Sequence, residues 1–314
     1  MSENRKKVHQ KLSTLRVLEQ DVKVEADKLG DETTAVTPED LRMMYSAYIV
    51  IDLLKRFVAY QNKLKGLARA HGAIYSLVED ELTADLQQFE EGFGEAKKRL
   101  EKIAKKHPLT ERLGKIKGFT PYQLGLIMGY IRDISRFETP SRLCVYAGVA
   151  PKHGHHVSKK NINRIRQAEH VLQPEKETEF GYNTAFQGRM YVITDCLLRA
   201  RGYFYTMYNG IRPRLEQRAI NGNECFMATA QDQKESKGKM KAGEWYMKGR
   251  KNQSLKAWSN SNARWRVART LLHLIYTEWR ELRGLEARNP YPIDYLGHSS
   301  YISLEDVLKA EEKK

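Results

Sequence analysis

The chain has 314 residues, with 54 Lys and Arg against 39 Asp and Glu, a formal net charge of +15 and a pI near 9.5. Hydrophobic residues make up 41% of it, which argues against a wholly disordered chain, and the lack of an apolar run of about 18 residues argues against a membrane-spanning helix. The positive surplus indicates a polyanionic partner, nucleic acid above all, although a basic protein without such a partner has the same composition.

The cysteines and the first residues bear on the compartment. Cys144, Cys196 and Cys225 form no Cys-x-x-Cys pair, which argues against a zinc ribbon and a disulfide scaffold. The segment 1–10 is polar and lacks the apolar centre of a signal peptide. We expect a reduced, cytoplasmic and nucleoid-associated protein without membrane contact.

Three regions follow one another along the chain. Residues 1–39 are a polar lead, expected to be disordered or a frayed helix, and Thr37 to Asp40 combine a capping hydroxyl, a first-position proline and two acids. Residues 40–106 carry two heptad seams, at positions 50, 53, 57, 60, 64 and 67 and at 82, 86, 89, 93, 96, 100 and 103. They predict a long antiparallel coiled-coil hairpin that turns at His71-Gly72. It is either a dimerisation arm, giving a homo-oligomer, or an intramolecular pair.

Residues 107–314 predict a compact helical domain with long basic loops, so the fold class is mainly α. His107-Pro108 ends the heptads, and helices are expected after Thr120 and Thr139. Residues 151–185 are expected to be a loop with a short hairpin at most, and 221–260 to be irregular. A strong helix is predicted from about residue 262 to 283, capped by Gly284.

One turn has the pattern of a phosphate-binding element. Residues 113–125 place Gly118 between apolar residues, ahead of a helix capped by Thr120, as in a helix-hairpin-helix turn. Such a turn presents backbone N–H groups to a phosphate, and Lys115 and Lys117 flank it. The alternative is an ordinary tight connection between core helices.

The segment 231–270 is the most basic part of the chain, with eleven Lys and Arg against three acids. Trp245, Tyr246, Trp258 and Trp265 lie among these cations, and cations with stacking rings suit nucleic acid. The predicted contacts in this segment are Lys248, Arg250, Lys251, Arg264 and Arg266. The alternative is a solubilising surface over core tryptophans.

Residues 112–151 resemble the C-terminal transposase region of the insertion-sequence one-ten/one-sixteen family. The specific pieces are Asp133-Ile-Ser-Arg-Phe137 and Tyr146-Ala-Gly-Val-Ala-Pro151, at the separation that the family shows. Gly188-Arg189-Met190 and the basic helix at 262–284 resemble the family more faintly. The hairpin at 40–105 resembles the coiled coil that precedes this region in the family.

The resemblance implies site-specific DNA recombination. Family members join a RuvC-like nuclease domain, with clustered carboxylates, to this region with its nucleophilic serine, and some are guided by a structured RNA. No RuvC-like strands are found here, since Asp21, Glu25 and Asp27 lie in a polar helical tail. We therefore identify no cofactor and no metal ligands in this chain. Mg²⁺ would enter only through a partner nuclease domain on a separate chain.

The family's serine falls shortly after Pro151, where Ser158 matches with a shift in register. It would attack a phosphodiester, form a 5′-phosphoserine link and release a 3′-hydroxyl, with His155 and His156 as bases. The surrounding basic residues, predicted to contact nucleic acid, are Lys152, Lys159, Lys160, Arg164 and Arg166. The alternatives are an inert basic loop, or a metal held by His153, His155 and His156.

These observations predict a DNA-binding, transposase-like protein that acts in transposition or site-specific recombination. If it is an enzyme, it is a transposase or recombinase that cleaves and joins strands through Ser158. Its partners would be DNA, a guide RNA in some forms, and a second copy of itself. The alternatives are a non-catalytic DNA-binding or architectural protein derived from a transposase and, third, an RNA-binding protein.

Overall fold

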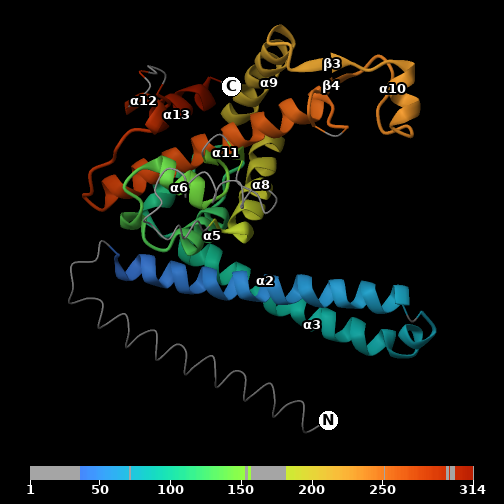
Figure 1. Ribbon diagram of the computed structural model, residues 1–314. Coiled ribbons are helices and arrows are strands. Elements are labelled where there is room, and N and C mark those ends of the chain that lie inside the picture. The colour runs from blue at the N-terminus through green and yellow to red at the C-terminus, as the bar shows by residue number, and fades with distance from the viewer. Residues whose placement is uncertain are drawn as a thin grey trace, which may run out of the picture. The chain divides into compact units, whose positions relative to one another are not determined.

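A computed structural model of the protein describes residues 36–70, 72–152, 155–156, 182–250, 252–294, 297 and 301–313 (Figure 1). Its helices are α2 (Pro38–Ala70), α3 (Gly72–Ala104), α4 (Pro108–Leu113), α5 (Pro121–Ile131), the 3₁₀ turn η1 (Ile134–Arg136), α6 (Pro140–Tyr146), α8 (Thr184–Arg199), α9 (Tyr203–Asn221), α10 (Ala230–Glu235), α11 (Leu255–Leu282), α12 (Tyr291–Asp294) and α13 (Leu304–Glu312). Its strands are β1 (Pro151–Lys152), β2 (His155–His156), β3 (Cys225–Met227) and β4 (Trp245–Met247). The prediction of a mainly α fold is confirmed. None of the helices in these ranges combines the length and apolarity that crossing a membrane requires.

The chain forms two compact units. The first comprises Met1–His107 together with Met128–Ile134, and the second comprises Pro108–Ile127 and Ser135–Lys314. The first of these divisions falls after His107, one residue beyond the boundary predicted between 106 and 107. The assignment of Met128–Ile134 to the first unit differs from it, because the end of α5 packs on α2: a Cβ at Gly129 would overlap the side chain of Ala47.

In the first unit, α2 and α3 run antiparallel (Figure 1). Early residues of α2 meet the chain just after α3, as in the contact between Asp40 and His107, while Tyr60 packs on Phe89 with ring centroids 5.6 Å apart. The start of α2 is fixed by a reciprocal cap, in which the Thr37 hydroxyl accepts from the Asp40 amide and the Asp40 carboxylate accepts from the Thr37 amide. The predicted helix start is therefore confirmed.

The predicted seams largely coincide with the less exposed faces of these helices. Val50, Leu64 and Leu100 are buried, whereas Leu67 is exposed. The remaining seam positions are half-buried, because a single packed helix covers only one side of each side chain. The segment 1–35 lies outside the described residues.

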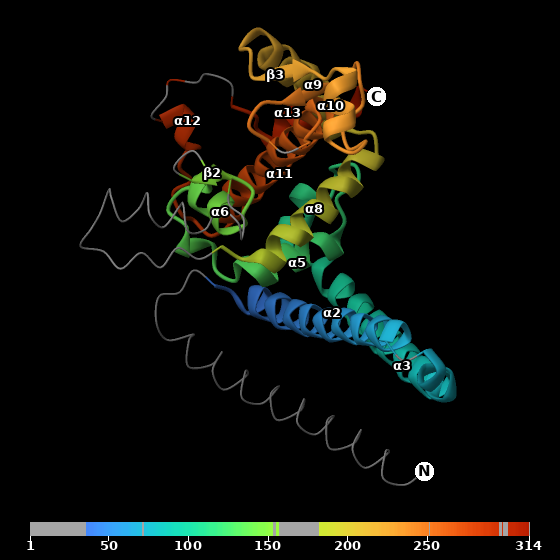
Figure 2. The ribbon, with the colours of Figure 1, turned by 45° about the vertical axis from the view of Figure 1, so that its right-hand side comes forward.

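The second unit is built around α11, which α6, α8 and α9 contact (Figure 2). Its buried face comprises Ala263, Val267, Ala268, Leu271, Leu272, Leu274, Ile275, Tyr276 and Trp279. Ser254 caps the helix by accepting from the Ala257 amide, and Gly284, at φ +65°, ends it, with the Leu285 amide donating to the Arg280 carbonyl. The predicted helix and its glycine are confirmed, but α11 begins seven residues earlier than predicted.

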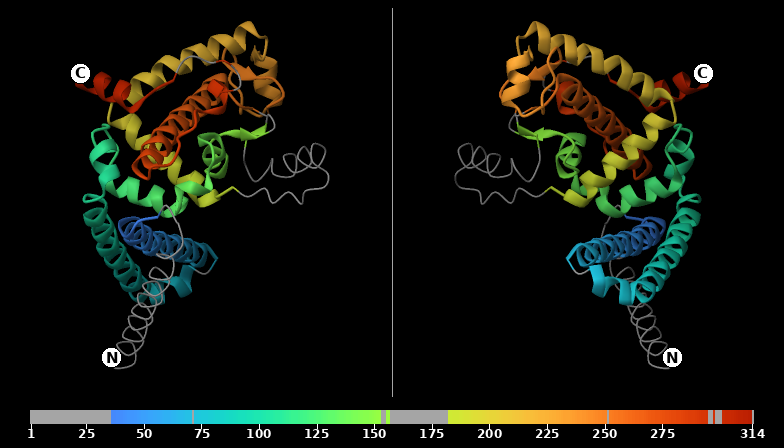
Figure 3. Two further views of the ribbon diagram at one scale, coloured as in Figure 1. Left: turned by 90° about the vertical axis from the view of Figure 1, so that its left-hand side faces the viewer. Right: turned by 90° about the vertical axis from the view of Figure 1, so that its right-hand side faces the viewer.

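Two short antiparallel pairs interrupt the helices. β1 pairs with β2, which bears out the short hairpin expected after Pro151. β3 pairs with β4 in the register Cys225↔Met247, Phe226↔Tyr246 and Met227↔Trp245. The connection that joins the two strands contains α10 (orange in Figure 3). The expectation of an irregular segment at 221–260 is wrong for this part, because the strands are three residues long and too short to show a periodic pattern.

Candidate nucleic-acid interface

The region formed by α10, β3, β4 and the start of α11 carries an exposed basic surface, which we call the basic tip. It consists of Lys234, Lys237, Lys239, Lys241, Lys248, Arg250 and Lys256, and all seven side chains are exposed. Lys248 donates to the Asn223 side chain and Arg250 to that of Gln253, but none of the seven forms an ion pair within the described residues. Their positive charge is therefore not cancelled by direct pairing.

Two acidic side chains of the basic tip region accept hydrogen bonds from groups of the same region. Asp232 accepts from the backbone amide and the hydroxyl of Thr229, and these hydrogen bonds lower the pKa of Asp232. A Glu244 oxygen accepts from the Tyr246 hydroxyl at 3.3 Å. These carboxylates fix local structure, and the neighbouring lysines remain available to an external anion.

The four aromatic residues of the basic segment divide into two kinds. Tyr246 and Trp258 are buried at 3% and 6% exposure, which fits the alternative of core aromatics for these two. Trp265 is half-buried and packs edge-on against Tyr191. Trp245 is half-buried and makes no ring contact within the described residues, so it is the ring best placed to stack on a base.

A second basic group lies on α9 and α11, and we call it the arginine cluster: Arg218, Arg266 and Arg269. Partial burial, and then the charge of Arg218, lower the pKa of Arg266, although much of its side chain is exposed. Burial likewise lowers the pKa of Arg269, to which the charge of Arg266 adds. None of the three guanidinium groups has an ion pair or hydrogen bond within the described part of the chain. A cluster of like charges with no counterion favours binding of an anion.

Neutral groups adjoin this cluster. Burial, assisted by the charge of Arg269, lowers the pKa of His273 to about 4, so this imidazole is neutral at pH 7. Burial raises the pKa of Cys144 to about 12, against the opposing effect of Arg269. Cys144 is therefore a buried, uncharged thiol beside Arg269 and not a nucleophile.

Arg264, a predicted contact, is held inside the protein. Its guanidinium lies 2.9 Å from the Asp195 carboxylate, donates to Asn260 and covers the Tyr191 ring at 5.2 Å. Arg266, two residues further along the same helix and therefore on another side of it, is exposed. The structure thus separates two arginines that the sequence treated alike: Arg264 ties α11 to α8, and Arg266 faces outward.

The predicted phosphate-binding turn is tightly packed. Gly118 has φ +82°, and a Cβ there would lie 2.6 Å from the Ala200 Cβ and 2.9 Å from the Cys196 carbonyl oxygen. Thr120 caps α5 through an exchange with Gln123. The glycine is accounted for by contact with the end of α8, as the tight-connection alternative requires.

The two lysines of this turn differ. Lys115 is exposed and has no ion pair among the described residues, so it can contact phosphate. Lys117 lies 3.7 Å from Glu311, whose other oxygen accepts from the Tyr203 amide at the start of α9. Lys117 thus joins a structural contact between α13 and α9.

Several predicted residues fall where the structure gives no side-chain description. Lys152 lies on β1, and the structure describes its backbone but not its side chain. The residues that lie outside the described ranges are Ser158, Lys159, Lys160, Arg164, Arg166 and Lys251. In the ranges that are described, His, Cys, Asp and Glu form no cluster that could hold a metal ion.

Arg218 is a candidate anion contact that the sequence patterns did not indicate. It lies in a helix with mixed charges and outside the basic segment. Only the packing of α9 on α11 brings it to Arg266, 48 positions later in the chain. The signal in the sequence was weak: Arg212, Arg214 and Arg218 follow one another with Glu216 as the one acid between them.

Comparisons with protein-family models, with curated proteins and with solved structures find no match for this chain.

Proposed function

We propose that this chain binds DNA and acts in DNA transposition or site-specific recombination. The observation that carries the binding half is the arginine cluster, three guanidinium groups on two packed helices with no acidic partner in the described residues. The basic tip adds seven exposed cations in the same unit. The recombination half rests on the resemblance of residues 112–151 to the transposase region.

The charge arrangement favours phosphate over other anions. Guanidinium groups donate two parallel hydrogen bonds to phosphate oxygens, and their fixed geometry suits a repeating backbone. Each phosphate that is neutralised releases condensed counterions, so the logarithm of affinity falls with the logarithm of salt concentration by about 0.9 per contact. Binding through the arginine cluster and the basic tip together therefore has a steep salt dependence.

The chemical step would belong to Ser158. Its Oγ attacks the phosphorus of the scissile diester, the O3′–P bond breaks, and the strand's 5′-phosphate becomes linked to the serine. The leaving 3′-oxygen takes up a proton, and the serine proton passes to a base, for which His155 and His156 are the candidates nearest in sequence. A metal-dependent cut elsewhere would need the carboxylates of a partner nuclease.

DNA binding is tested by fluorescence anisotropy with a labelled duplex at several salt concentrations. The variant Arg218→Gln with Arg266→Gln removes two unpaired charges. The control, Arg142→Gln with Lys309→Gln, removes two exposed charges that are paired at 2.9 and 2.6 Å. We expect at least about tenfold weaker binding and a shallower salt slope for the first variant, and less than about twofold for the control. Equal losses in both would reject the arginine cluster as the contact.

Recombination is tested with DNA that carries the ends of the gene's own genetic neighbourhood. Wild type and Ser158→Ala are incubated with this DNA and Mg²⁺, and covalent protein–DNA adducts are sought on a denaturing gel. An adduct formed only by wild type supports a serine recombinase. Salt-sensitive binding without an adduct in either protein favours the architectural protein, and an adduct that survives the substitution places the nucleophile elsewhere. A labelled RNA of equal length, run as a competitor, tests the RNA-binding alternative.

A further inference from the structure

An apolar patch lies on α8, outside the basic segment. Tyr191 is 49% and Val192 48% exposed, and they are the one pair of sequence neighbours among the large apolar side chains that the described residues expose. A Cβ built at Gly188, one turn earlier, would meet no packed atom of another segment within 4 Å. Side chains on a helix lean toward its N-terminus, so the glycine leaves the surface beside Tyr191 and Val192 open. Single exposed apolar residues are ordinary, whereas an adjoining pair indicates a contact site.

Arg264 and Trp265 of α11 support the Tyr191 ring from the protein side. The Arg264 guanidinium carbon lies over the ring, 5.2 Å from its centroid, and the Trp265 ring meets it at 63° with the centroids 6.1 Å apart. A tyrosine ring that is covered on both faces would expose little beyond its rim and its hydroxyl. The 49% exposure of Tyr191 therefore leaves ring surface that a planar group can contact.

Ion pairing and hydrogen bonds hold the supporting guanidinium in place. Arg264 lies 2.9 Å from the Asp195 carboxylate of α8, and its Nε donates to the Asn260 side chain of α11 at 3.2 Å. The Tyr208 hydroxyl of α9 donates to the same Asn260 oxygen at 2.6 Å. Three helices thus fix Arg264 behind the ring. A ring that is already positioned loses little conformational entropy when a ligand stacks on it.

The charges around the patch favour an anionic ligand. Asp195 also pairs with Arg199, 2.6 Å away and 80% exposed, so one carboxylate lies between two guanidinium groups and the local charge is positive. On α11, Trp265 directly precedes Arg266 and lies one turn before Arg269. Residues three or four apart on a helix have Cβ atoms about 5–6 Å apart, so the patch adjoins the arginine cluster. A planar group on the patch and an anion on the cluster can therefore belong to one ligand.

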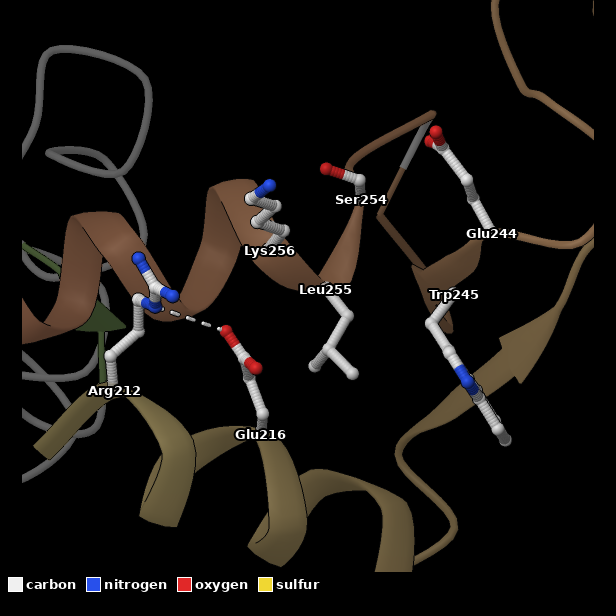
Figure 4. Close-up of a pocket in the computed structure, with 7 residues that line it drawn as sticks. All are labelled: Arg212, Glu216, Glu244, Trp245, Ser254, Leu255 and Lys256. Atoms are coloured by element: carbon white, nitrogen blue, oxygen red, sulfur yellow. Dashed lines mark ion pairs between the residues drawn. The ribbon is translucent and has the colours of Figure 1, made fainter. Parts of the chain in front are cut away.

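Trp245, the ring of the basic segment that a base could reach, is less well supported. It lines a pocket of about 460 Å³ together with Glu244, Leu255 and residues of α9 (Figure 4). The indole and the Glu244 carboxylate point away from each other there, and no cation covers the indole within the described residues. Trp245 thus lacks the support that Arg264 gives to Tyr191, and it is the competing ring in the test.

We propose that Tyr191 stacks on an unpaired base of a bound DNA strand, with Arg264 behind the ring and the strand's phosphates on the arginine cluster. Such stacking accepts any of the bases, because each has a π-face. The inference deepens the proposed function and rests on it, since the base belongs to the DNA that the chain is proposed to bind. An RNA strand offers the same planar base and phosphate, and the experiment separates the two sources.

The test compares two labelled single strands of equal length, one of thymidines and one whose central nucleotides lack the base. Both carry the same phosphates, so a difference in affinity reports the bases. In fluorescence anisotropy, we expect wild type to bind the thymidine strand at least about fivefold more tightly, and Tyr191→Leu to bind both strands equally. Tyr191→Phe keeps the ring and should keep the preference. So should the control Tyr48→Leu, which alters a tyrosine of α2 that is 60% exposed.

A second measurement needs no variant. Tetranitromethane nitrates exposed tyrosines, and peptide mass spectrometry of the wild type reports each site. The thymidine strand should slow the nitration of Tyr191, whereas the strand without central bases should not, and Tyr48 should react equally with either strand. This result decides the question even where Tyr191→Leu fails to fold, which circular dichroism would show. Equal nitration of Tyr191 with both strands would overturn the proposal.

Other outcomes separate the possible failures. If wild type binds both single strands equally and still binds a duplex, the proposed function stands and Tyr191 is not a stacking platform. If it binds neither single strand nor duplex, the proposed function is wrong. Loss of the preference in Trp245→Leu alone would place the stacking at the competing ring. Tighter, Tyr191-dependent binding of an oligouridine would overturn the assignment to DNA. A changed oligomeric state of Tyr191→Leu in sedimentation, without any base preference in wild type, would make the patch a contact between copies.

Discussion

The Nε2 atom of His107 lies 2.9 Å from the Oδ1 atom of Asp40, and both side chains are 1% exposed. The two residues are 67 positions apart, at the start of α2 and just after the end of α3. The same Asp40 carboxylate accepts from the Thr37 amide at the start of α2. One buried carboxylate therefore caps the start of α2 and also bonds to His107, just after the end of α3.

Breaking this contact should destabilise the first unit. Asp40→Asn retains an acceptor for the Thr37 amide, and His107→Gln retains a polar side chain, yet each leaves a buried group poorly satisfied. We expect each to lower the free energy of unfolding by about 1–3 kcal/mol. In urea unfolding, the double variant should lose less than the two single losses combined. Asp52→Asn, which breaks the exposed Asp52–Arg56 pair, should cost less than about 1 kcal/mol. Additive losses would show that the two residues do not act together.

His273 should make stability depend on pH. Its pKa in the folded protein is about 4, below the ordinary value of 6.5, because burial and then Arg269 disfavour its charged form. Between these values the unfolded chain binds a proton that the folded chain excludes. Stability is therefore lost as the pH falls from about 6.5 to about 4, by about 3 kcal/mol at most. His273→Asn should flatten this part of the curve of unfolding free energy against pH. Parallel curves for the two proteins would reject the assignment.

Glu311 should stabilise the start of α9. Gly202 supplies no side chain to cap this helix, and the Tyr203 amide donates instead to Glu311 Oε1 at 2.8 Å. Glu311→Ala should lower the midpoint of thermal unfolding, by an amount that corresponds to a loss of about 1–2 kcal/mol in the free energy of unfolding. Glu312→Ala, one residue further on, is the matched control and should have little effect. The prediction fails if both changes shift the midpoint alike.

Gly118→Ala should damage packing more than binding. The glycine has φ +82°, and its Cβ position lies 2.6 Å from the Ala200 Cβ. We expect a loss of about 1–3 kcal/mol in the free energy of unfolding, from backbone strain and overlap together. Adding Ala200→Gly should recover part of it. Folded Gly118→Ala protein should bind DNA within about twofold of wild type, and a large loss of affinity without loss of stability would restore the predicted phosphate-binding turn.

The three thiols should react in a definite order. Cys144 and Cys225 are buried, and burial raises the pKa of both, to about 12 for Cys144. At pH 8 only about 10⁻⁴ of Cys144 would be thiolate, the form that reacts. Cys196 is half-buried and should be alkylated first by N-ethylmaleimide, as peptide mass spectrometry would show. Modification of Cys144 before Cys196 in the folded protein would contradict its burial beside Arg269.

Local patterns were sufficient to predict α2, α3 and α11, whereas α9, α10, α12 and α13 were not predicted. The Thr37 cap, the apolar periodicity of α11 and the Gly284 stop all act within a few residues, and each is found where expected. The strands β3 and β4 were not predicted, because three residues are too few to show an alternating pattern. Their pairing also joins residues that are up to 22 positions apart in the chain. Ser158 and its basic loop remain predictions, because they lie outside the described residues.

The composition and the order of residues determined by themselves that the protein is basic and mainly helical. They could not determine which of its cations are neutralised. Arg264 and Arg266 are two positions apart on one helix, yet Asp195, 69 residues before Arg264, pairs with it, while Arg218 brings a like charge to Arg266. That an arginine carries a positive charge follows from its type, whereas its counterion is set by which helices pack together. Only the tertiary structure therefore distinguished the arginine that is paired inside the fold from those that have no counterion within the described residues.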